Sequence, residues 1–178
     1  MRALVVYESM FGNTRSVAEA VAAGLESGLP VAAVEVGSAP AVLPEDVGLL
    51  VVGGPTHAFG MSRPGTRESA AGQTDQPLVS AGAGIREWLA AVQLDRLART
   101  GEPVAAAAFD TRIDKPRLPG SAARGAEKLL RRRGFTVATR AVSFYVTGSA
   151  PSQLRPGELE QARRWGEQLA ALPHGTRI

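Results

Sequence analysis

Short apolar runs alternate with amphipathic stretches along the chain, and this alternation limits the fold more than any other feature of the sequence. The first run, residues 3–7 (ALVVY), is almost continuously apolar, as expected of a strand buried on both faces of a sheet. Four more strand-like runs follow, at residues 31–36, 48–52, 104–109 and within 136–146. Strands separated by helices form a parallel sheet covered on both faces. We therefore predict that residues 1–178 form a single α/β domain, a three-layer sandwich around a five-stranded parallel sheet.

An amphipathic helix is expected directly after the first strand. Val17, Val21 and Leu25 recur there at helical spacing. Asn13 or Thr14 is expected to cap the N-terminus of this helix, because short polar side chains bond well to the first free N–H groups.

The later connections are less regular. Residues 37–44 contain two prolines, which leaves room for about one helical turn. Residues 56–82 are polar and rich in Gly, Ser, Thr and Pro, and loops of that length are usually functional or disordered. Helices are then predicted over 85–92 and 121–133, and a last one begins near Pro156. The residues of this last helix expected to face inward are Leu159, Ala162, Gly166 and Leu169.

The composition argues against several kinds of site and partner. The 178 residues include no Cys and two His, so disulfides, thiolate metal sites and His-rich metal sites are not expected. The net charge of +3 is small, and aromatic residues make up only 5 %, which argues against nucleic-acid binding. No apolar run approaches the roughly 18 residues that a membrane helix needs, and the N-terminus does not resemble a signal peptide. A cytoplasmic protein without membrane contact is therefore expected.

The strongest functional signal is the loop 9–14 (SMFGNT), which joins the first strand to the first helix. Ligands of open parallel sheets bind outside the carboxyl ends of the strands, where the strand order reverses. The free N–H groups and the dipole of a helix N-terminus favour an anion there. Gly12 lets the backbone curl round a ligand. The loop contains neither GxxxxGK[ST] nor GxGxxG, so a terminal monophosphate fits better than a nucleoside triphosphate or a dinucleotide.

This stretch resembles the signature of the flavodoxins. The residues that match at the required spacing are Val5, Val6, Tyr7, Ser9, Gly12, Thr14 and Ala18. The resemblance implies a flavodoxin-like sandwich with the strand order 2-1-3-4-5, which is the order known for flavodoxin. It also implies that the first loop binds the phosphate of flavin mononucleotide (FMN). The residues in question are Ser9, Met10, Phe11, Gly12, Asn13 and Thr14.

A second loop, 53–60 (GGPTHAFG), resembles the flavodoxin loop in which Pro-Thr precedes an aromatic residue that stacks on the isoalloxazine. His57 stands in the place of that aromatic residue, which is usually Trp. An imidazole can stack on the flavin or hydrogen-bond to it, and His57 is the one candidate here for proton transfer. Phe59 is the alternative source of a stacking ring. The cofactor-binding residues expected in this loop are Pro55, Thr56, His57, Ala58, Phe59 and Gly60.

A third loop is expected to begin at Phe109 and to include Asp110, Thr111 and Arg112. It resembles the flavodoxin loop that supports the outer flavin face and reads the pyrimidine edge. Flavodoxins commonly place a Tyr there, whereas residues 110–119 contain neither Tyr nor Trp. The outer face is then either open to a second substrate or covered by Met61 or by the partner chain of a homodimer. Asp110 is alternatively a turn residue.

Three arginines, Arg63, Arg67 and Arg112, are predicted near the same edge of the sheet. They would meet a phosphate or an anionic substrate, or else remain solvated. Arg124 belongs to the predicted helix 121–133, and no function is assigned to it.

Three functions are consistent with these features. The first is an NAD(P)H-linked, FMN-dependent reductase of quinones or similar small acceptors, in which the flavin supplies the redox chemistry. The second is an electron carrier that needs a separate redox partner, although such short flavodoxins are typically strongly acidic and this chain is not. The third is a flavin-free regulatory module, since a fold does not fix a function.

Overall fold

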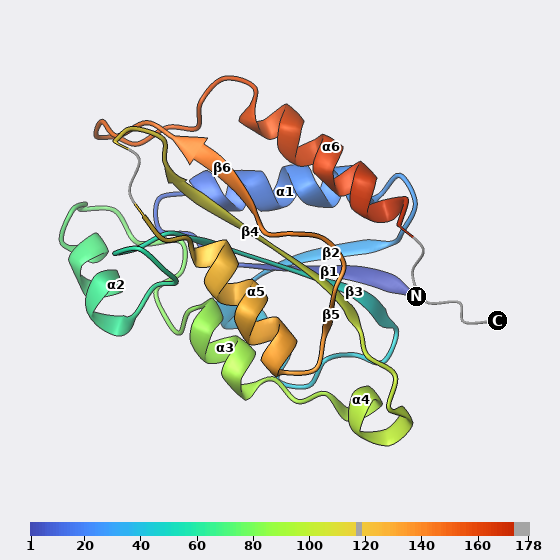
Figure 1. The fold of residues 1–178 in the computed structure, drawn as a ribbon. Helices are drawn as coiled ribbons and strands as arrows, with labels where there is room; N and C mark the ends of the chain where they lie inside the picture. Colours follow the sequence, from blue (N-terminus) through green and yellow to red (C-terminus); the bar gives the residue numbers. More distant parts are fainter. Residues whose placement is uncertain (117–118, 173–178) are drawn as a thin grey trace.

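A single parallel sheet forms the centre of the molecule (Figure 1). The computed structural model describes residues 1–116 and 119–172. The strands are β1 (Arg2–Tyr7), β2 (Val31–Glu35), β3 (Val47–Pro55), β4 (Ala105–Ile113), β5 (Thr136–Val137) and β6 (Val142–Val146). The sheet has the order β2-β1-β3-β4-β5, with β6 also paired to β4. The predicted α/β class and strand order are therefore confirmed.

The fifth strand differs from the prediction, because it is divided in two. Thr136 in β5 pairs with the start of β4, and Val142 in β6 pairs with Phe109 near the middle of β4. Between the two strands, the N–H of Ala141 donates to the Glu127 carboxylate at 2.8 Å instead of joining the ladder. The single strand predicted within residues 136–146 is thus interrupted at residues 138–141.

Helices cover both faces of the sheet (Figure 1). On one face lie α1 (Asn13–Leu25) and α6 (Glu158–Ala170), and on the other lie α3 (Ile85–Ala91) and α5 (Ala122–Arg132). The shorter helices are α2 (Pro64–Ala71) and α4 (Asp95–Thr100), and the 3-10 turn η1 (Val36–Ser38) follows β2. No helix in the described part of the chain is long and apolar enough to cross a membrane.

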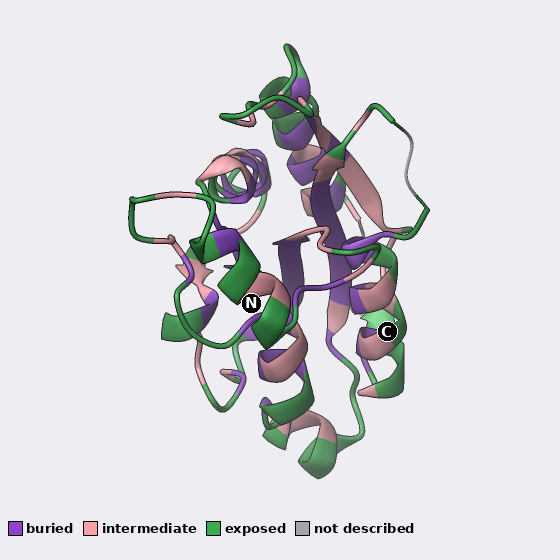
Figure 2. Cartoon of the chain, turned by 90° about the vertical axis from the view of Figure 1, so that its left-hand side faces the viewer, coloured by how far each residue is buried: buried purple, intermediate pink, exposed green. Residues whose placement is uncertain are grey.

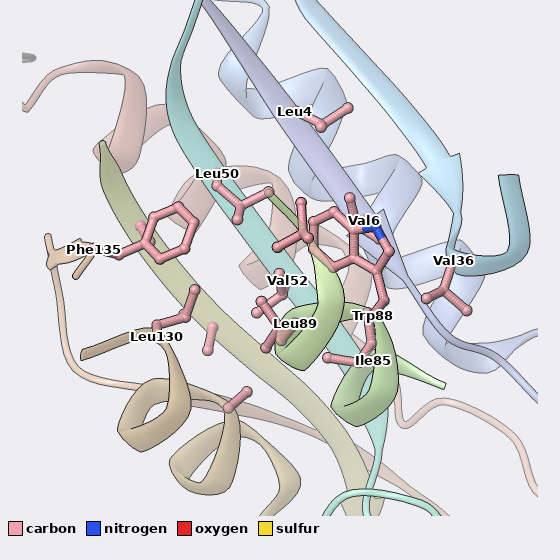
Figure 3. Close-up of a cluster of buried hydrophobic side chains, with 14 of the residues drawn as sticks. Leu4, Val6, Val36, Leu50, Val52, Ile85, Trp88, Leu89, Leu130 and Phe135 are labelled. Carbon is pink, nitrogen blue, oxygen red and sulfur yellow. The ribbon is translucent and has the colours of Figure 1, made fainter. Parts of the chain in front are cut away.

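The strands are buried between the two helical layers, whose outer sides are exposed (Figure 2). In β1, Leu4 and Val6 pack toward α3 and α5, whereas Val5 packs toward α1 and α6. Figure 3 shows the first of these clusters, in which Trp88 and Leu89 of α3 lie against β1 and β3. This alternation is the period of two expected for a strand covered on both faces.

The second cluster, on the α1 and α6 face, contains three aromatic rings. Phe109, Phe144 and Trp165 contact each other edge to face, with ring centroids 6.0 to 6.2 Å apart. Trp165 occupies the inward face of α6. Leu159, which was expected to face inward, is 45 % exposed, so this part of the prediction is wrong. The helix begins at Glu158, so Leu159 lies in its first turn, beyond the apolar face that packs on α1.

The backbones of α1 and α6 are in close contact. A Cβ placed on Gly24 would lie 1.9 Å from the Arg163 carbonyl oxygen, and one placed on Gly166 would lie 2.2 Å from the Val21 carbonyl oxygen. Glycine is therefore required at both positions for this helix pair to approach so closely.

Two of the predicted loops are more regular than expected. Residues 56–82 include the helix α2, which has Pro64 at its first turn. β4 continues to Ile113, so the residues from Phe109 to Arg112 lie in a strand rather than in a loop. The strand extends because Gly53, Gly54 and Pro55 of β3 remain paired with it.

Candidate functional site

The carboxyl ends of β1, β3 and β4 lie together at the edge of the sheet that carries α2 (Figure 1). β1 and β3 are neighbours, but the chain leaves β1 for α1 on one face and β3 for α3 on the other. This is the switch point at which open α/β sheets bind ligands. The structure thus brings the loop 9–14 and the turn 57–60 to one edge, beside the end of β4.

The loop 9–14 enters α1 through Gly12, which is the N-cap residue with a left-handed φ of 102°. The N–H of Gly12 donates to the Ser9 hydroxyl at 3.1 Å. The prediction that Asn13 or Thr14 caps the helix is wrong, because both side chains bond elsewhere. The Asn13 amide donates to the Ser152 carbonyl at 2.9 Å, and the Thr14 hydroxyl lies 2.6 Å from the Thr111 hydroxyl.

These bonds determine which groups of the loop face outward. Ser9 and Thr14 are almost completely buried, and their hydroxyls hold the shape of the loop from within. Phe11, in contrast, is 52 % exposed, and a Cβ placed on Gly12 would meet no atom within 4 Å. The N–H groups of the first turn of α1 have no acceptor within the helix. They are the donors that this loop offers to an anion, and the space beside Gly12 is open.

Thr56 connects the end of β3 to α5. Its N–H donates to the Thr111 carbonyl at 2.9 Å, which extends the ladder between β3 and β4. Its hydroxyl donates to the Asp110 carboxylate and accepts from the N–H of Ala122, both at 2.9 Å. The side chain of this predicted cofactor-binding residue is thus bonded within the protein.

The next four residues, His57 to Gly60, form a tight turn. His57 and Gly60 exchange two backbone hydrogen bonds of 2.8 and 2.9 Å. Ala58 and Phe59 both have positive φ, 42° and 73°, as in a type I′ turn. Residues other than glycine adopt this conformation at a cost of roughly 1–2 kcal/mol each. The strained turn presents Phe59, which is 57 % exposed, at the edge of the sheet.

Gly120 fits directly against this turn. A Cβ placed on Gly120 would lie 2.0 Å from the Phe59 carbonyl oxygen, and its φ of 85° also favours glycine. This glycine, two residues before α5, therefore packs directly on the turn.

His57 is half-buried, and burial lowers the pKa of its imidazole below the ordinary value. The nearby Glu8 carboxylate opposes this shift, and the charge of Arg67 adds to it. Since the net effect is a lowered pKa, the imidazole is neutral at pH 7 and can both donate and accept a hydrogen bond.

Asp110 lies inside β4 and is completely buried, so its interpretation as a turn residue is wrong. Besides the bond from Thr56, its Oδ2 accepts from the Ser121 hydroxyl at 2.5 Å and from the N–H of Ala123 at 3.0 Å. Its Oδ1 is buried and has no hydrogen-bond partner in the part of the chain that the structure describes. A carboxylate in this position compensates the positive end of the α5 dipole.

Phe109 and Met61 do not lie where a ligand would need them. The ring of Phe109 covers Gly53 in the core, and a Cβ on that glycine would be 2.0 Å from the ring. Met61 is buried against Gly125 of α5, so its side chain does not cover an outer flavin face. Both side chains are therefore buried within the protein in this structure.

The three predicted arginines differ in how far their side chains are exposed. Arg67 pairs with Glu87 at 3.2 Å, and its side chain is only 11 % exposed. Arg63 is exposed at the start of α2. Arg112 is half-buried in β4. Only Arg63 therefore resembles the solvated surface charge that was one of the two alternatives.

Sequence reasoning missed Glu8, Ser62 and Ser80. Glu8 is 1 % exposed and accepts hydrogen bonds from the Ser62 hydroxyl and, at 2.9 Å, from the N–H of Ile85. A charged residue directly after a buried strand, one position before the loop 9–14, was the available signal. The two serines are indistinguishable from other loop serines in the sequence, so only the fold identifies them.

A small cavity lies beneath the end of β3, between α3 and α5. It is of a size to hold about one water molecule, and the residues around it include Glu8, Gly54, Pro55, Ser62 and Ile85. Among residues 1–116 and 119–172, no group of three or more His, Asp or Glu side chains could hold a metal ion.

The sequence profile of the family described as flavodoxin matches residues 5–96, which is just over half of the chain. The chain belongs to the flavodoxin family. The predicted resemblance is thereby confirmed, and it extends well beyond the loop 9–14. A search of curated proteins gave no significant sequence match.

Solved structures support the same fold. A flavodoxin from the domain Archaea is 21 % identical, with a TM-score of 0.62 over 96 % of each chain. Flavodoxin 1 of Bacillus cereus is 16 % identical, with a TM-score of 0.62 over 97 % of this flavodoxin-family chain and 99 % of its own. A WrbA-like flavodoxin of Agrobacterium tumefaciens is 20 % identical, with a TM-score of 0.57 over 95 % and 94 % of the two chains. At these identities the likeness establishes the fold alone.

Proposed function

We propose that this flavodoxin-family protein binds FMN at the carboxyl ends of β1, β3 and β4. The observation that carries the proposal is the loop 9–14. It has no lysine, it leads into the N-terminus of α1, and it leaves open space beside Gly12. A phosphate monoester fits such a site, because the amides and the helix dipole supply the positive potential that it needs. When bound, FMN supplies one- or two-electron redox chemistry.

The flavin ring is expected to lie between the turn 57–60 and the end of β4. Phe59 is the exposed ring in that turn, and the neutral imidazole of His57 is placed to hydrogen-bond to a flavin edge or to hold a proton there. Asp110, Thr111 and Thr56 support this region from within, since their side chains are already bonded in the protein. Arg112 and the backbone at the end of β4 complete the proposed contacts.

We further propose that the loaded protein is an NAD(P)H-linked reductase of quinones or similar small acceptors. Two features favour this activity over electron carriage. The net charge is +3, and residues 110–119 contain no Tyr or Trp to cover the outer face of the flavin. An uncovered face lets a nicotinamide or a quinone ring approach the cofactor.

An electron carrier is the second candidate. It is favoured by the likeness to proteins described as flavodoxins, which match this chain over 96 % or more of both chains. Such a carrier would exchange electrons with a redox partner protein and would show almost no NAD(P)H oxidation on its own.

The proposed cofactor is tested by titrating the apoprotein with FMN and following flavin fluorescence. We expect saturable quenching with one FMN per chain. No quenching would exclude FMN binding and leave the flavin-free regulatory module as the explanation. If FMN binds, steady-state oxidation of NADH or NADPH with a benzoquinone as acceptor separates the reductase from the carrier.

The phosphate assignment is tested by the double variant Ser9→Ala, Thr14→Val, in which the loop loses two internal hydroxyls. We expect FMN affinity to fall by roughly 1 kcal/mol for each hydroxyl removed, the usual net contribution of a neutral hydrogen bond, because these hydroxyls hold the loop whose amides face the anion. Riboflavin affinity should remain unchanged. Ser27→Ala is the matched control, because Ser27 bonds to the Gly24 carbonyl at the opposite end of α1. Equal losses for FMN and riboflavin would contradict the assignment.

A further inference from the structure

The outer face of α5 carries positive charge that the protein does not balance. The helix contains four basic residues and one acidic residue, Glu127, which pairs with Arg131 at 3.0 Å. The other three, Arg124, Lys128 and Arg132, are exposed, and none of them forms an ion pair in the described part of the chain. We call these three residues the basic stripe. Because they are spaced four positions apart, they lie along one side of the helix.

The helices on the opposite face of the sheet are balanced (Figure 1). In α1 and α6, every basic residue pairs with an acidic residue three or four positions away. The pairs are Arg15 with Glu19, Arg163 with Glu160 and Glu167, and Arg164 with Glu160. The basic stripe is therefore a local feature of α5 and not a general property of the helical surface.

The stability of α5 does not explain the basic stripe. Like charges four positions apart repel each other and destabilise a helix. Arg124 lies in the first turn, which contains no acidic residue, and there its charge opposes the positive end of the helix dipole. Only Arg132, in the last turn, is favoured by the dipole. An anionic partner outside the chain would make the charges of Arg124 and Lys128 favourable.

The basic stripe begins beside the candidate site. The N–H of Ala122, in the first turn of α5, donates to the Thr56 hydroxyl at 2.9 Å. Gly125 lies against the Met61 side chain, directly after the turn 57–60. From Arg124 to Arg132 the helix rises by about 12 Å. A partner that covers the basic stripe would therefore reach the edge at which the flavin is expected.

The surroundings of the basic stripe favour a protein over other anionic partners. The apolar residues of α5, among them Ala126 and Leu130, are buried in the core, so the helix has no apolar face to insert into a lipid surface. It contains no aromatic side chain on which a base could stack. A few exposed charges are typical of the small, electrostatically steered interfaces of electron-transfer proteins.

We propose that the basic stripe of α5 is the docking surface for an acidic redox partner protein, whose carboxylates pair with Arg124, Lys128 and Arg132. The redox role of this partner rests on the proposed function. The docking itself requires only the folded chain, so it is tested on the apoprotein.

The probe is a peptide of about ten glutamates, which is long enough to span the basic stripe. It is titrated into isotope-labelled apoprotein, and the amide resonances are followed by NMR. We expect saturable shifts centred on residues 122–132 and extending to the turn 57–60. The affinity should fall with added salt, because salt screens exposed charges. Shifts centred on any other face would overturn the proposal.

The triple variant Arg124→Gln, Lys128→Gln, Arg132→Gln removes the basic stripe. We expect its affinity for the peptide to fall about 10-fold, as for the loss of three exposed ion pairs. Its free energy of unfolding should stay the same or rise slightly, because the repulsion within α5 is relieved. A loss of binding without a loss of stability distinguishes a docking role from a structural one. Unchanged peptide affinity would overturn the proposal.

The matched control removes three other exposed arginines, in Arg15→Gln, Arg99→Gln, Arg164→Gln. It changes the net charge by the same amount but leaves the basic stripe intact. We expect it to keep most of the peptide affinity. An equal loss in both triple variants would mean that net charge alone attracts the peptide, and would overturn the docking surface.

Two further titrations test the class of partner and its link to the flavin. A DNA duplex or phosphatidylserine vesicles that bound residues 122–132 more tightly than the peptide would overturn the assignment to a protein. If the peptide binds to α5 but FMN does not bind, the proposed function and the redox role of the partner both fail. If FMN binds and the peptide does not, only the docking surface fails.

Discussion

The two helical layers of this protein are held to the same sheet by different chemistry. The layer of α1 and α6 packs through glycine contacts and a cluster of three aromatic rings. The layer of α3 and α5 covers Glu8 and Asp110, the two most deeply buried carboxylates among the described residues. Both carboxylates lie at the carboxyl end of their strands, where the candidate site is found.

The two layers therefore make different contributions, one mainly to stability and the other mainly to the geometry of the site. Apolar packing is favourable wherever shapes match, and it does not depend on particular polar partners. A buried carboxylate is favourable only with its donors in place, so it fixes the arrangement of the segments that supply them. The α1 and α6 layer therefore acts as the stable support, and the buried carboxylates on the other face fix the positions of the segments that bond to them.

The largest expected effect tests the support layer. Gly24→Ala places a methyl group against the Arg163 carbonyl and should force α1 and α6 apart. We expect a loss of about 3 kcal/mol in the free energy of unfolding, at the upper end for overpacking, measured by urea denaturation. Flavin affinity of the folded protein should not change. Gly65→Ala in α2, where a Cβ would meet nothing within 4 Å, is the control and should be neutral or slightly stabilising. A harmless Gly24→Ala would contradict the close contact.

A smaller effect is expected on the polar side. Asp110→Ala leaves Thr56, Ser121 and the N–H of Ala123 without their shared acceptor. We expect a loss of about 2 kcal/mol in the free energy of unfolding, together with weaker FMN binding. Asp110→Asn retains one acceptor oxygen and should lose clearly less. If alanine lowered stability but left FMN affinity unchanged, the two layers would not differ in the way described.

The smallest expected effect concerns pH. The pKa of His57 lies below the ordinary value of 6.5 in the folded protein, mainly because of burial. The unfolded chain therefore binds more protons than the folded one as the pH falls below 6.5, and stability decreases until the folded-state pKa is passed. Urea midpoints measured between pH 7.5 and 5.5 should fall slightly, and His57→Gln should remove most of that fall. An identical pH profile for the variant would place the titration elsewhere.

Much of the fold follows from the sequence alone. The strand order and the layers follow from the alternation of apolar runs, since a parallel sheet with helical crossovers allows few arrangements. The exact strand ends do not follow, because pairing extends a strand beyond its apolar run. Asp110 and Thr111 read as loop residues, yet their partners in β3 keep them in β4. The division of the last strand does not follow either, because the sequence does not show that the Ala141 N–H bonds to Glu127 rather than to β4.

The sequence predicts loops that meet at one edge of the sheet, and the structure brings the loop 9–14 and the turn 57–60 together there, but the hydrogen-bond partners of their side chains could not be derived. Ser9, Thr14 and Thr56 read as donors for a ligand, whereas the structure bonds them internally. In a sequence, a hydroxyl that binds a ligand cannot be told from one that bonds within the protein. The bonds that join Glu8 and Ser9 to Ser62, Ser80 and Ile85 also could not be predicted, since they connect residues more than 50 positions apart.

The bonds of Asn13 and Thr14 have a consequence for how the protein is made. Thr14 reaches Thr111 across 97 positions, and Asn13 reaches Ser152 across 139. Contacts of such long range form late, because the intervening chain must first be ordered. The loop 9–14 is synthesised before the other segments of the site, yet its hydrogen bonds are thus among the last to form. A nascent chain that stops short of residue 152 already contains every residue of the flavodoxin signature, yet it lacks the geometry to use it.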